Sequence, residues 1–365
     1  MHLNRRHFLI TGAALAGAMA LPELAAAQFA PRPGAWRRFQ ITTRLEITTA
    51  SDKVQGWIPL PAVNEAAWFR SGENSWTTNG KAAVTTGRGS GAKMLQVEWA
   101  HTNDAPVVEV VSIVETRDRA IDLSKPDEAS RLSDAARRRY TSGSKFIPID
   151  GIVARTSEKI ASSAKSDLNK VRAIYEWMAA NTARDDKVRG CGIGDIASML
   201  KSGNLTGKCA DLNALFVGLV RAQGIPARDI YGIRVAASKF GYKSLGTASE
   251  VITKAQHCRA EVYLTGYGWI ACDPADVRKV ILEEPPTNLT MDDPKVESVR
   301  QALFGSWEGN WLAYNFAHDV VLPGSDGPKL AFLMYPQAEC GSTRLDCLDP
   351  DNFKYTIKTK ELTSA

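Results

Sequence analysis

The chain has 365 residues, a formal net charge of +5 and a hydrophobic content of 44%. This length allows two domains that each bury a hydrophobic core. The net charge is only mildly positive, and the one basic run, residues 137–139, is not interleaved with aromatic residues, which argues against a nucleic-acid-binding protein. The sequence contains no internal repeat and no low-complexity segment that would indicate a fibrous or disordered chain.

Residues 1–27 have the pattern of an export signal. The basic segment Asn4–Leu9 contains paired arginines followed by Phe-Leu, then comes a short apolar run, and Ala25 and Ala27 supply small residues at a cleavage site. This order is typical of a twin-arginine signal peptide cleaved after Ala27. The apolar run is shorter than the ~20 residues that a membrane-spanning helix needs, and no later run is longer. We therefore expect a periplasmic or secreted protein without stable membrane insertion.

Residues 28–125 are predicted to form a small antiparallel β-sandwich. Apolar residues alternate with polar ones from Phe39 to Ile47, the period of a strand with one buried face. Further strands are expected at 54–59, 94–99 and 107–116. The Gly-, Ser- and Asn-rich stretch 80–91 is predicted to be turn. Because this domain offers no group of catalytic side chains, we expect it to support the rest or to dock substrate.

Residues 126–365 are predicted to form an α+β catalytic domain with a C-terminal extension. One helix has Leu168, Val171, Ile174, Tyr175 and Met178 on a single face, and Trp177 on that helix is expected to pack in the core. The run of three arginines at 137–139 is predicted to be a solvated helix face. The apolar extension beyond residue 276 is expected to add strands that complete the catalytic domain.

Cys209 is predicted to lie at the start of a helix. Apolar residues between Leu212 and Val220 follow helical spacing that buries one stripe, and Gly224 and Pro226 end the helix. The N–H groups and partial positive charge at a helix N-terminus lower a thiol pKa, so Cys209 fits a nucleophile. An inert buried cysteine is the alternative. Gly207 would let the backbone approach a reacting carbonyl.

A predicted β-hairpin between Gln256 and Asp276 places His257 and Asp273 at its open end. A thiol nucleophile needs an imidazole to accept its proton, and a carboxylate that orients the imidazole. After cleavage only His101, His257 and His318 would remain. We expect His101 in the β domain and His318 in a core or capping role, which leaves His257.

The register of this hairpin decides whether the pair can meet. A turn on Gly266-Tyr267 would leave His257 and Asp273 three positions apart, about 10 Å. Side-by-side placement requires a register centred on Thr265, through a bulge or a wider loop. In that register Cys258 and Cys272 become cross-strand neighbours. We predict the two pairings together.

These motifs resemble the transglutaminase-like superfamily of bacteria. The resemblance extends over about 173–275 and comprises Gly-x-Cys at the start of a helix, Gly-Ile-Pro-Ala-Arg at its end, and a histidine followed by Glu-Val-Tyr-Leu and Gly-Tyr-Gly-Trp-x-x-x-Asp-Pro. It implies Cys209 as nucleophile, His257 as base and Asp273 as orienting acid on a papain-like α+β fold, preceded by the β-sandwich. Trp177 would lie near a conserved family tryptophan, so a wall or oxyanion role is the alternative to core packing.

Cys258-Arg259 departs from the family pattern, where a small residue and a tryptophan often follow the histidine. The departure affects the transfer of pocket specificity and leaves the three catalytic positions unchanged.

Six cysteines in an exported chain suggest disulfides. Cys340 and Cys347 can close a short loop, Cys258 and Cys272 form the conditional pair, and Cys191 is left over. A zinc site is the alternative, but no Cys-x-x-Cys occurs, and we expect neither metal nor cofactor.

The predicted chemistry is acyl transfer through a Cys209 acyl-enzyme, most simply hydrolysis of peptide or protein amides. No calcium-loop spacing or amine-binding site is evident in the sequence. An amine-accepting, cross-linking transglutaminase is one alternative. A non-catalytic periplasmic binding protein on the same fold is another, which retention of all three residues disfavours.

Overall fold

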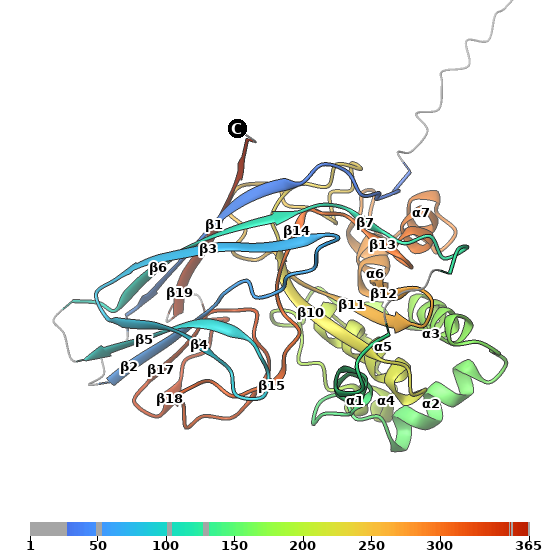
Figure 1. Ribbon diagram of the computed structural model, residues 1–365, viewed down its shortest axis with the longest axis horizontal. Helices are drawn as coiled ribbons and strands as arrows, with labels where there is room; N and C mark the ends of the chain where they lie inside the picture. The colour runs from blue at the N-terminus through green and yellow to red at the C-terminus, as the bar shows by residue number, and fades with distance from the viewer. Residues whose placement is uncertain are drawn as a thin grey trace, which may run out of the picture.

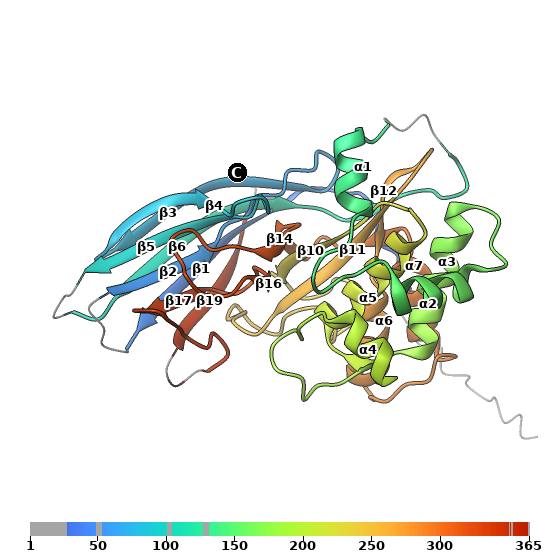
Figure 2. The ribbon, with the colours of Figure 1, turned by 90° about the horizontal axis from the view of Figure 1, so that it is seen from below.

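A computed structural model of the chain describes residues 28–48, 53–100, 104–126, 131–349, 351 and 353–363. The predicted signal segment 1–27 and His101 lie outside these ranges. The long strands gather at one end of the molecule and the helices at the other, as both views show (Figures 1 and 2). Within the described ranges, no helix combines the length and hydrophobicity needed to span a bilayer.

The β-rich end is a sandwich of two antiparallel sheets, in the orders β19-β1-β6-β3 and β18-β17-β2-β5-β4. Four of its strands match the predicted ones: β1 (Arg37–Ile47), β2 (Lys53–Pro59), β5 (Lys93–Ala100) and β6 (Val107–Thr116). Inward-facing apolar side chains such as Leu45 form one core between the sheets. Period-two alternation therefore located β1, whose burial alternates along the strand, whereas β2 is buried at every residue from Val54 to Pro59.

Strands β3 (Phe69–Thr78) and β4 (Lys81–Thr86) were not predicted. The expectation of turn over 80–91 is wrong for 81–86. β4 is an edge strand without a fully buried residue, and β3 buries only Phe69 completely. Alternation is weak in such strands because neither face is committed to a core.

The C-terminal extension is divided between the two ends of the molecule. β14 (Trp311–Asn315) pairs with β10 (Ala227–Arg234) in the catalytic sheet, as expected. The expectation is wrong for β17 (Gln337–Cys340), β18 (Thr343–Arg344) and β19 (Phe353–Leu362), which complete the two sandwich sheets. β19 pairs along the length of β1, from Arg38 opposite Leu362 to Ile47 opposite Phe353. The last strand therefore belongs to the first domain, and the sandwich is assembled from both ends of the chain.

The catalytic half is an antiparallel sheet, in the order β12-β11-β10-β14, against which the helix α5 (Cys209–Ala222) packs. Every residue from Cys209 to Arg221 is buried, so the prediction of one buried stripe is wrong. The sheet covers one side of α5, and neighbouring helices cover the others. A helix enclosed in this way is apolar nearly all round, as its sequence is.

The helices around α5 follow the predicted pattern where one was given. α3 (Asp167–Asn181) buries the predicted face, with Leu168 half-buried at its edge. α1 (Asp134–Thr141) has no buried residue and carries the exposed arginines 137–139 as a solvated face. The other helices are α2 (Gly151–Ala161), α4 (Ile196–Ser202), α6 (Pro274–Glu283) and α7 (Pro294–Ala302). The remaining short strands are β7 (Arg119–Ala120), β8 (Ala183–Arg184), β9 (Thr206–Gly207), β13 (Ser306–Trp307), β15 (His318–Val320) and β16 (Leu330–Phe332).

A buried ion-pair network ties the catalytic sheet to the segments that lead out of the sandwich. Glu261, which is fully buried, pairs with Arg119, and its Oε2 accepts from Arg228 Nε at 2.6 Å. Arg228 also reaches Glu65 at 2.7 Å. Burial opposes ionisation of Glu261, but Arg228 and Arg119 outweigh it and lower the pKa of this carboxyl. The network is therefore charged and fully paired, as buried ions must be.

All six cysteines lie in the described part of the chain, and none forms a disulfide. Both predicted disulfides are therefore wrong. Cys347 instead accepts a hydrogen bond from Gln337 Nε2 at 3.3 Å, and Cys340 is opposite Thr343 in the tight β17–β18 hairpin. Cys191, for which no disulfide partner was predicted, lies beside Cys209.

Candidate active site

Cys209 is the first residue of α5, as predicted, and is 3% exposed. The chain before it is extended, and Ala210 N–H donates to the Cys191 carbonyl at 2.9 Å. This bond fixes the 190–194 loop against the helix start. The Cys209 N–H has no intrahelical acceptor because it belongs to the first turn, so it can face an oxyanion.

Asp211 shapes the helix start. Its carboxylate accepts the backbone N–H groups of Ile193 and Gly194 at 2.9 Å each and that of Lys208 at 3.0 Å. A Cβ at Gly192, whose φ is +92°, would collide with this carboxylate, and one at Gly207 would lie 2.6 Å from Asp211 Cβ. Gly207 therefore makes room for Asp211, which corrects the expectation that it makes room for a reacting carbonyl.

The hairpin of β11 (Gln256–Leu264) and β12 (Gly268–Cys272) has a different register from the predicted one. Ala260 is opposite Cys272, so Cys258 is not, and the predicted coupling of the two pairings is wrong. In this register Asp273 would be opposite Arg259, which is two positions from His257. The pair meets nevertheless, because the chain turns out of the strand at Asp273 and the two side chains span the offset. His257 Nε2 lies 2.7 Å from Asp273 Oδ2.

Asp273 is fixed by its position as N-cap of α6. Its Oδ1 accepts Asp276 N–H at 3.1 Å and Asn213 Nδ2 at 3.2 Å, and it is fully buried. Asn213, one turn along α5 from Cys209, thus connects the helix that begins at Cys209 to the Asp273 carboxylate. Trp311 Nε1 donates to the His257 carbonyl at 2.9 Å and holds that end of β11.

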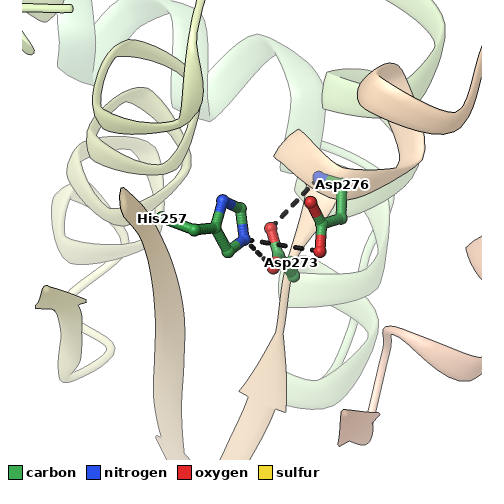
Figure 3. A group of neighbouring side chains, drawn as sticks. All are labelled: His257, Asp273 and Asp276. Atoms are coloured by element: carbon green, nitrogen blue, oxygen red, sulfur yellow. Dashed lines mark hydrogen bonds and ion pairs between the residues drawn. The ribbon is translucent and has the colours of Figure 1, made fainter. Parts of the chain in front are cut away.

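A second carboxylate, Asp276, faces the same edge of the imidazole and was not predicted. Its Oδ2 lies 3.4 Å from His257 Nε2 (Figure 3). Arg234 Nη2 donates to both of its oxygens, at 2.6 and 2.7 Å. The Asp-Pro-x-Asp spacing was the available signal, since an N-cap and its third following residue lie on the same side of the first turn.

These charges favour a protonated imidazole. Burial opposes the charge on His257, but Asp276 and then Asp273 outweigh it and raise the pKa of His257 to about 9. Burial also raises the pKa of Asp273, whereas Arg234 overcomes burial at Asp276 and lowers that pKa well below its usual value. The other ring nitrogen, Nδ1, is on the side away from both carboxylates (Figure 3). The imidazole contributes to lowering the pKa of the Cys209 thiol, and Nδ1 is the ring nitrogen that Asp273 leaves free to face the sulfur.

The sulfur of Cys209 is held among hydrogen-bond donors. The Cys191 thiol and then the Cys258 thiol, together with His257, lower the pKa of Cys209 well below its usual value despite burial, and Cys191 Sγ also donates to the Gln256 carbonyl at 3.5 Å. The lowered pKa of Cys209 and the raised pKa of His257 both favour the charged forms, a thiolate beside an imidazolium. No sequence motif assigned the two neighbouring thiols, because they come from a distant loop and from β11.

A cavity of about 800 Å³ opens onto Cys209 and His257, between the catalytic half and the sandwich. Cys191, Gln256 and Tyr335 line it near the thiol, and Phe353 and Tyr355 of β19 line it from the sandwich. Eight of its lining residues are lysine or arginine, and one is acidic. Strands of the sandwich therefore form one wall of the cavity, and the docking role of this domain stays a prediction.

Three residues singled out in the sequence lie outside this cavity lining. Trp177 packs against the hydrophobic core, in agreement with the preferred prediction. Arg259 is 2% exposed, its Nη1 donates to Glu308 O at 2.9 Å, and it stacks on Trp311. His318 is largely buried, 3.2 Å from Asp229, as expected for a core histidine.

His257, Asp273 and Asp276 are the group of three donors in the described ranges that lie close enough together for one metal ion. Their donors are already engaged. Arg234 neutralises Asp276, and Asp273 accepts from Asn213, from the Asp276 N–H and from the imidazole. The arrangement suits proton transfer better than metal binding.

The family model of the transglutaminase-like superfamily matches residues 154–274, which include Cys209, His257 and Asp273. A protein of Haemophilus influenzae described as uncharacterized is 36% identical over 323 residues, covering 84% of this chain and 86% of that protein. Residues 154–274 therefore form a transglutaminase-like superfamily domain.

One solved structure supports the fold. A candidate cysteine protease from Cytophaga hutchinsonii shares 15% identity and a TM-score of 0.50, covering 90% of this chain and 99% of that one. The periplasmic domain of TgpA from Pseudomonas aeruginosa shares 14% identity, covering 66% of this chain and 88% of that one, with a TM-score of 0.34, too low to establish a shared fold.

Proposed function

We propose that this protein is a thiol-dependent acyl-transfer enzyme that hydrolyses peptide or protein amides. The observation that carries the proposal is the Cys209–His257–Asp273 arrangement. His257 Nε2 lies 2.7 Å from Asp273 Oδ2, the pKa of the Cys209 thiol is lowered in part by His257, and the pKa of the imidazole is raised. A scaffold protein has no need of a buried thiolate–imidazolium pair, which disfavours the non-catalytic binding protein.

In the proposed reaction the Cys209 thiolate attacks the amide carbonyl carbon, and the helix N-terminus faces the oxyanion. The C–N bond breaks as the His257 imidazolium protonates the leaving amine, which leaves a thioester and a neutral imidazole. Water then attacks the thioester while the imidazole takes its proton, and the acid and the thiolate are released. Asp273 and Asp276 stabilise the imidazolium whenever it forms.

Water is the favoured acyl acceptor. A cross-linking transglutaminase would bring a lysine-type amine to Cys209, and the cationic lining of the cavity repels its protonated form. We further propose that the mature protein begins after Ala27 and acts in the periplasm or outside the cell, on peptides or proteins and without a metal or other cofactor.

The test is alkylation of the mature protein with iodoacetamide near pH 6, with labelled sites found by mass spectrometry. Rapid labelling at Cys209 that slows at least tenfold in His257→Ala supports the proposal, because the thiolate then lacks its imidazolium. Cys340→Ser provides a control for the other thiols. Slow labelling in wild type and variant alike would indicate an inert thiol and the binding-protein alternative.

The acceptor is assayed with casein. Cleavage products that require Cys209 support hydrolysis. Incorporation of dansylcadaverine into uncleaved casein would instead assign the cross-linking activity.

A further inference from the structure

The cavity over Cys209 differs sharply in charge from the rest of the chain. The whole chain has 45 basic and 40 acidic residues, whereas the cavity lining has eight basic residues and only Glu46 as an acid. The basic residues are Arg44, Arg184, Arg189, Lys208, Arg234, Lys254, Lys279 and Lys354.

Carboxylates neutralise about half of this positive charge. Arg44 pairs with Glu46, Arg189 with Asp346 and Arg234 with Asp276, while Arg184 and Lys279 share Glu283. Eight cations against these four carboxylates leave an excess of four positive charges.

Three lysines, Lys208, Lys254 and Lys354, have no carboxylate within 4 Å among the described residues. Lys279 is affected by its neighbours: burial, followed by the nearby Arg234, lowers its pKa. An uncompensated group of cations around a partly enclosed space focuses a positive potential on that space.

The three unpaired lysines line the cavity from three separate segments of the chain. Lys208 directly precedes Cys209, Lys254 lies in the turn before β11 and His257, and Lys354 projects from β19 of the sandwich. Both halves of the molecule thus contribute positive charge to one space next to the thiol, and the C-terminal strand brings the sandwich's share.

We propose that the cavity selects anionic peptides, with carboxylate side chains or a terminal carboxylate flanking the amide that Cys209 attacks. This inference rests on the proposed function and names its substrate class. Lysine and arginine bind carboxylates by charge-assisted hydrogen bonds, and their long-range field raises the local concentration of such peptides. A cavity of this size accommodates a short peptide segment.

The first experiment uses Cys209 as a probe of its own surroundings. Iodoacetate and iodoacetamide attack thiols by the same substitution and differ in charge, so their rate ratio at Cys209 reports the local potential. Reversing two exposed lysines in Lys254→Glu/Lys354→Glu should lower the iodoacetate rate about fivefold to tenfold at low salt. The iodoacetamide rate should stay within about twofold.

The matched control is Lys165→Glu/Lys360→Glu, which makes the same change of net charge at two exposed lysines outside the cavity. Lys360 lies on β19, the strand that carries Lys354. The control should leave both rates unchanged, and 0.5 M NaCl should reduce the iodoacetate preference of the wild type. An equal effect of both double variants, or no effect of either, would overturn the proposal.

The second experiment measures peptide recognition. Two acetylated, amidated peptides of equal length, one with glutamates flanking a central Ala-Ala bond and one with glutamines, compete with iodoacetamide for Cys209. The glutamate peptide should protect at a concentration about tenfold lower, and this advantage should disappear in Lys254→Glu/Lys354→Glu. Equal or better protection by the glutamine peptide refutes the anionic preference.

The two levels of the proposal fail differently. If neither reagent labels Cys209 rapidly, the proposed function fails and this inference fails with it. If iodoacetamide labels rapidly and charge makes no difference to reagent or peptide, the enzyme proposal stands and the anionic substrate class is wrong.

Discussion

The carboxylate of Asp276 should set the protonation of the catalytic imidazole. Its Oδ2 lies 3.4 Å from His257 Nε2. At an effective dielectric of about 20, two unit charges at that distance interact by about 5 kcal/mol, an upper bound of about 3.6 pKa units. Arg234 binds the same carboxylate through both oxygens and offsets part of this. We therefore expect Asp276→Asn to lower the pKa of His257 from about 9 by about 1–2 units.

The assay is an NMR titration of ¹³C-labelled histidine in the Cys209→Ala background, where the imidazole titrates without its thiol partner. The mature chain would have three histidines, so assignment by single substitutions is practical. Asp276→Asn leaves buried Arg234 unpaired, which costs about 3–5 kcal/mol of folding stability. Asp276→Asn/Arg234→Gln removes that cost, and there too the His257 pKa should fall, by less. A His257 pKa within about 0.3 unit of the parent in both variants would refute the reasoning.

Three further changes follow from the contacts. Cys191→Ala removes the thiol that bonds the Cys209 sulfur, so the Cys209 pKa should rise and iodoacetamide labelling at pH 5 should slow; an unchanged pH–rate profile would contradict this. Gly192→Ala forces a Cβ at positive φ into Asp211 and should cost about 2–4 kcal/mol in urea unfolding, whereas Gly203→Ala, at positive φ in open space, should cost about 1 kcal/mol. The pKa of Glu261 is lowered in the folded state, so the stability that this carboxylate contributes is present above the usual glutamate pKa and is lost as the pH falls through the folded value. Glu261→Gln should therefore reduce the free energy of unfolding at pH 7 by about 3–5 kcal/mol and make that free energy less dependent on acid pH. Urea unfolding curves unchanged by the substitution at pH 7 and 4 would contradict the pairing.

The sequence by itself determined the local features of this protein. Helical spacing after Cys209 placed the thiol at a helix start, and period-two alternation found β1 and the β11–β12 hairpin; β2, β5 and β6 were also located. These signals are local because each depends on residues only a few positions apart in the chain. Because only three histidines would remain after cleavage of the signal, His257 could be chosen by elimination.

Tertiary structure decided everything that depends on long-range pairing. The hairpin register differs by two positions from the one that would set His257 opposite Asp273, and the turn into α6 rather than the register brings them together. β19 returns to β1 and supplies Lys354 and the cavity wall, and Cys191 reaches Cys209 through a loop held by Asp211. Such contacts join segments whose own sequences are compatible with several partners, and only the packing of the whole chain selects among them.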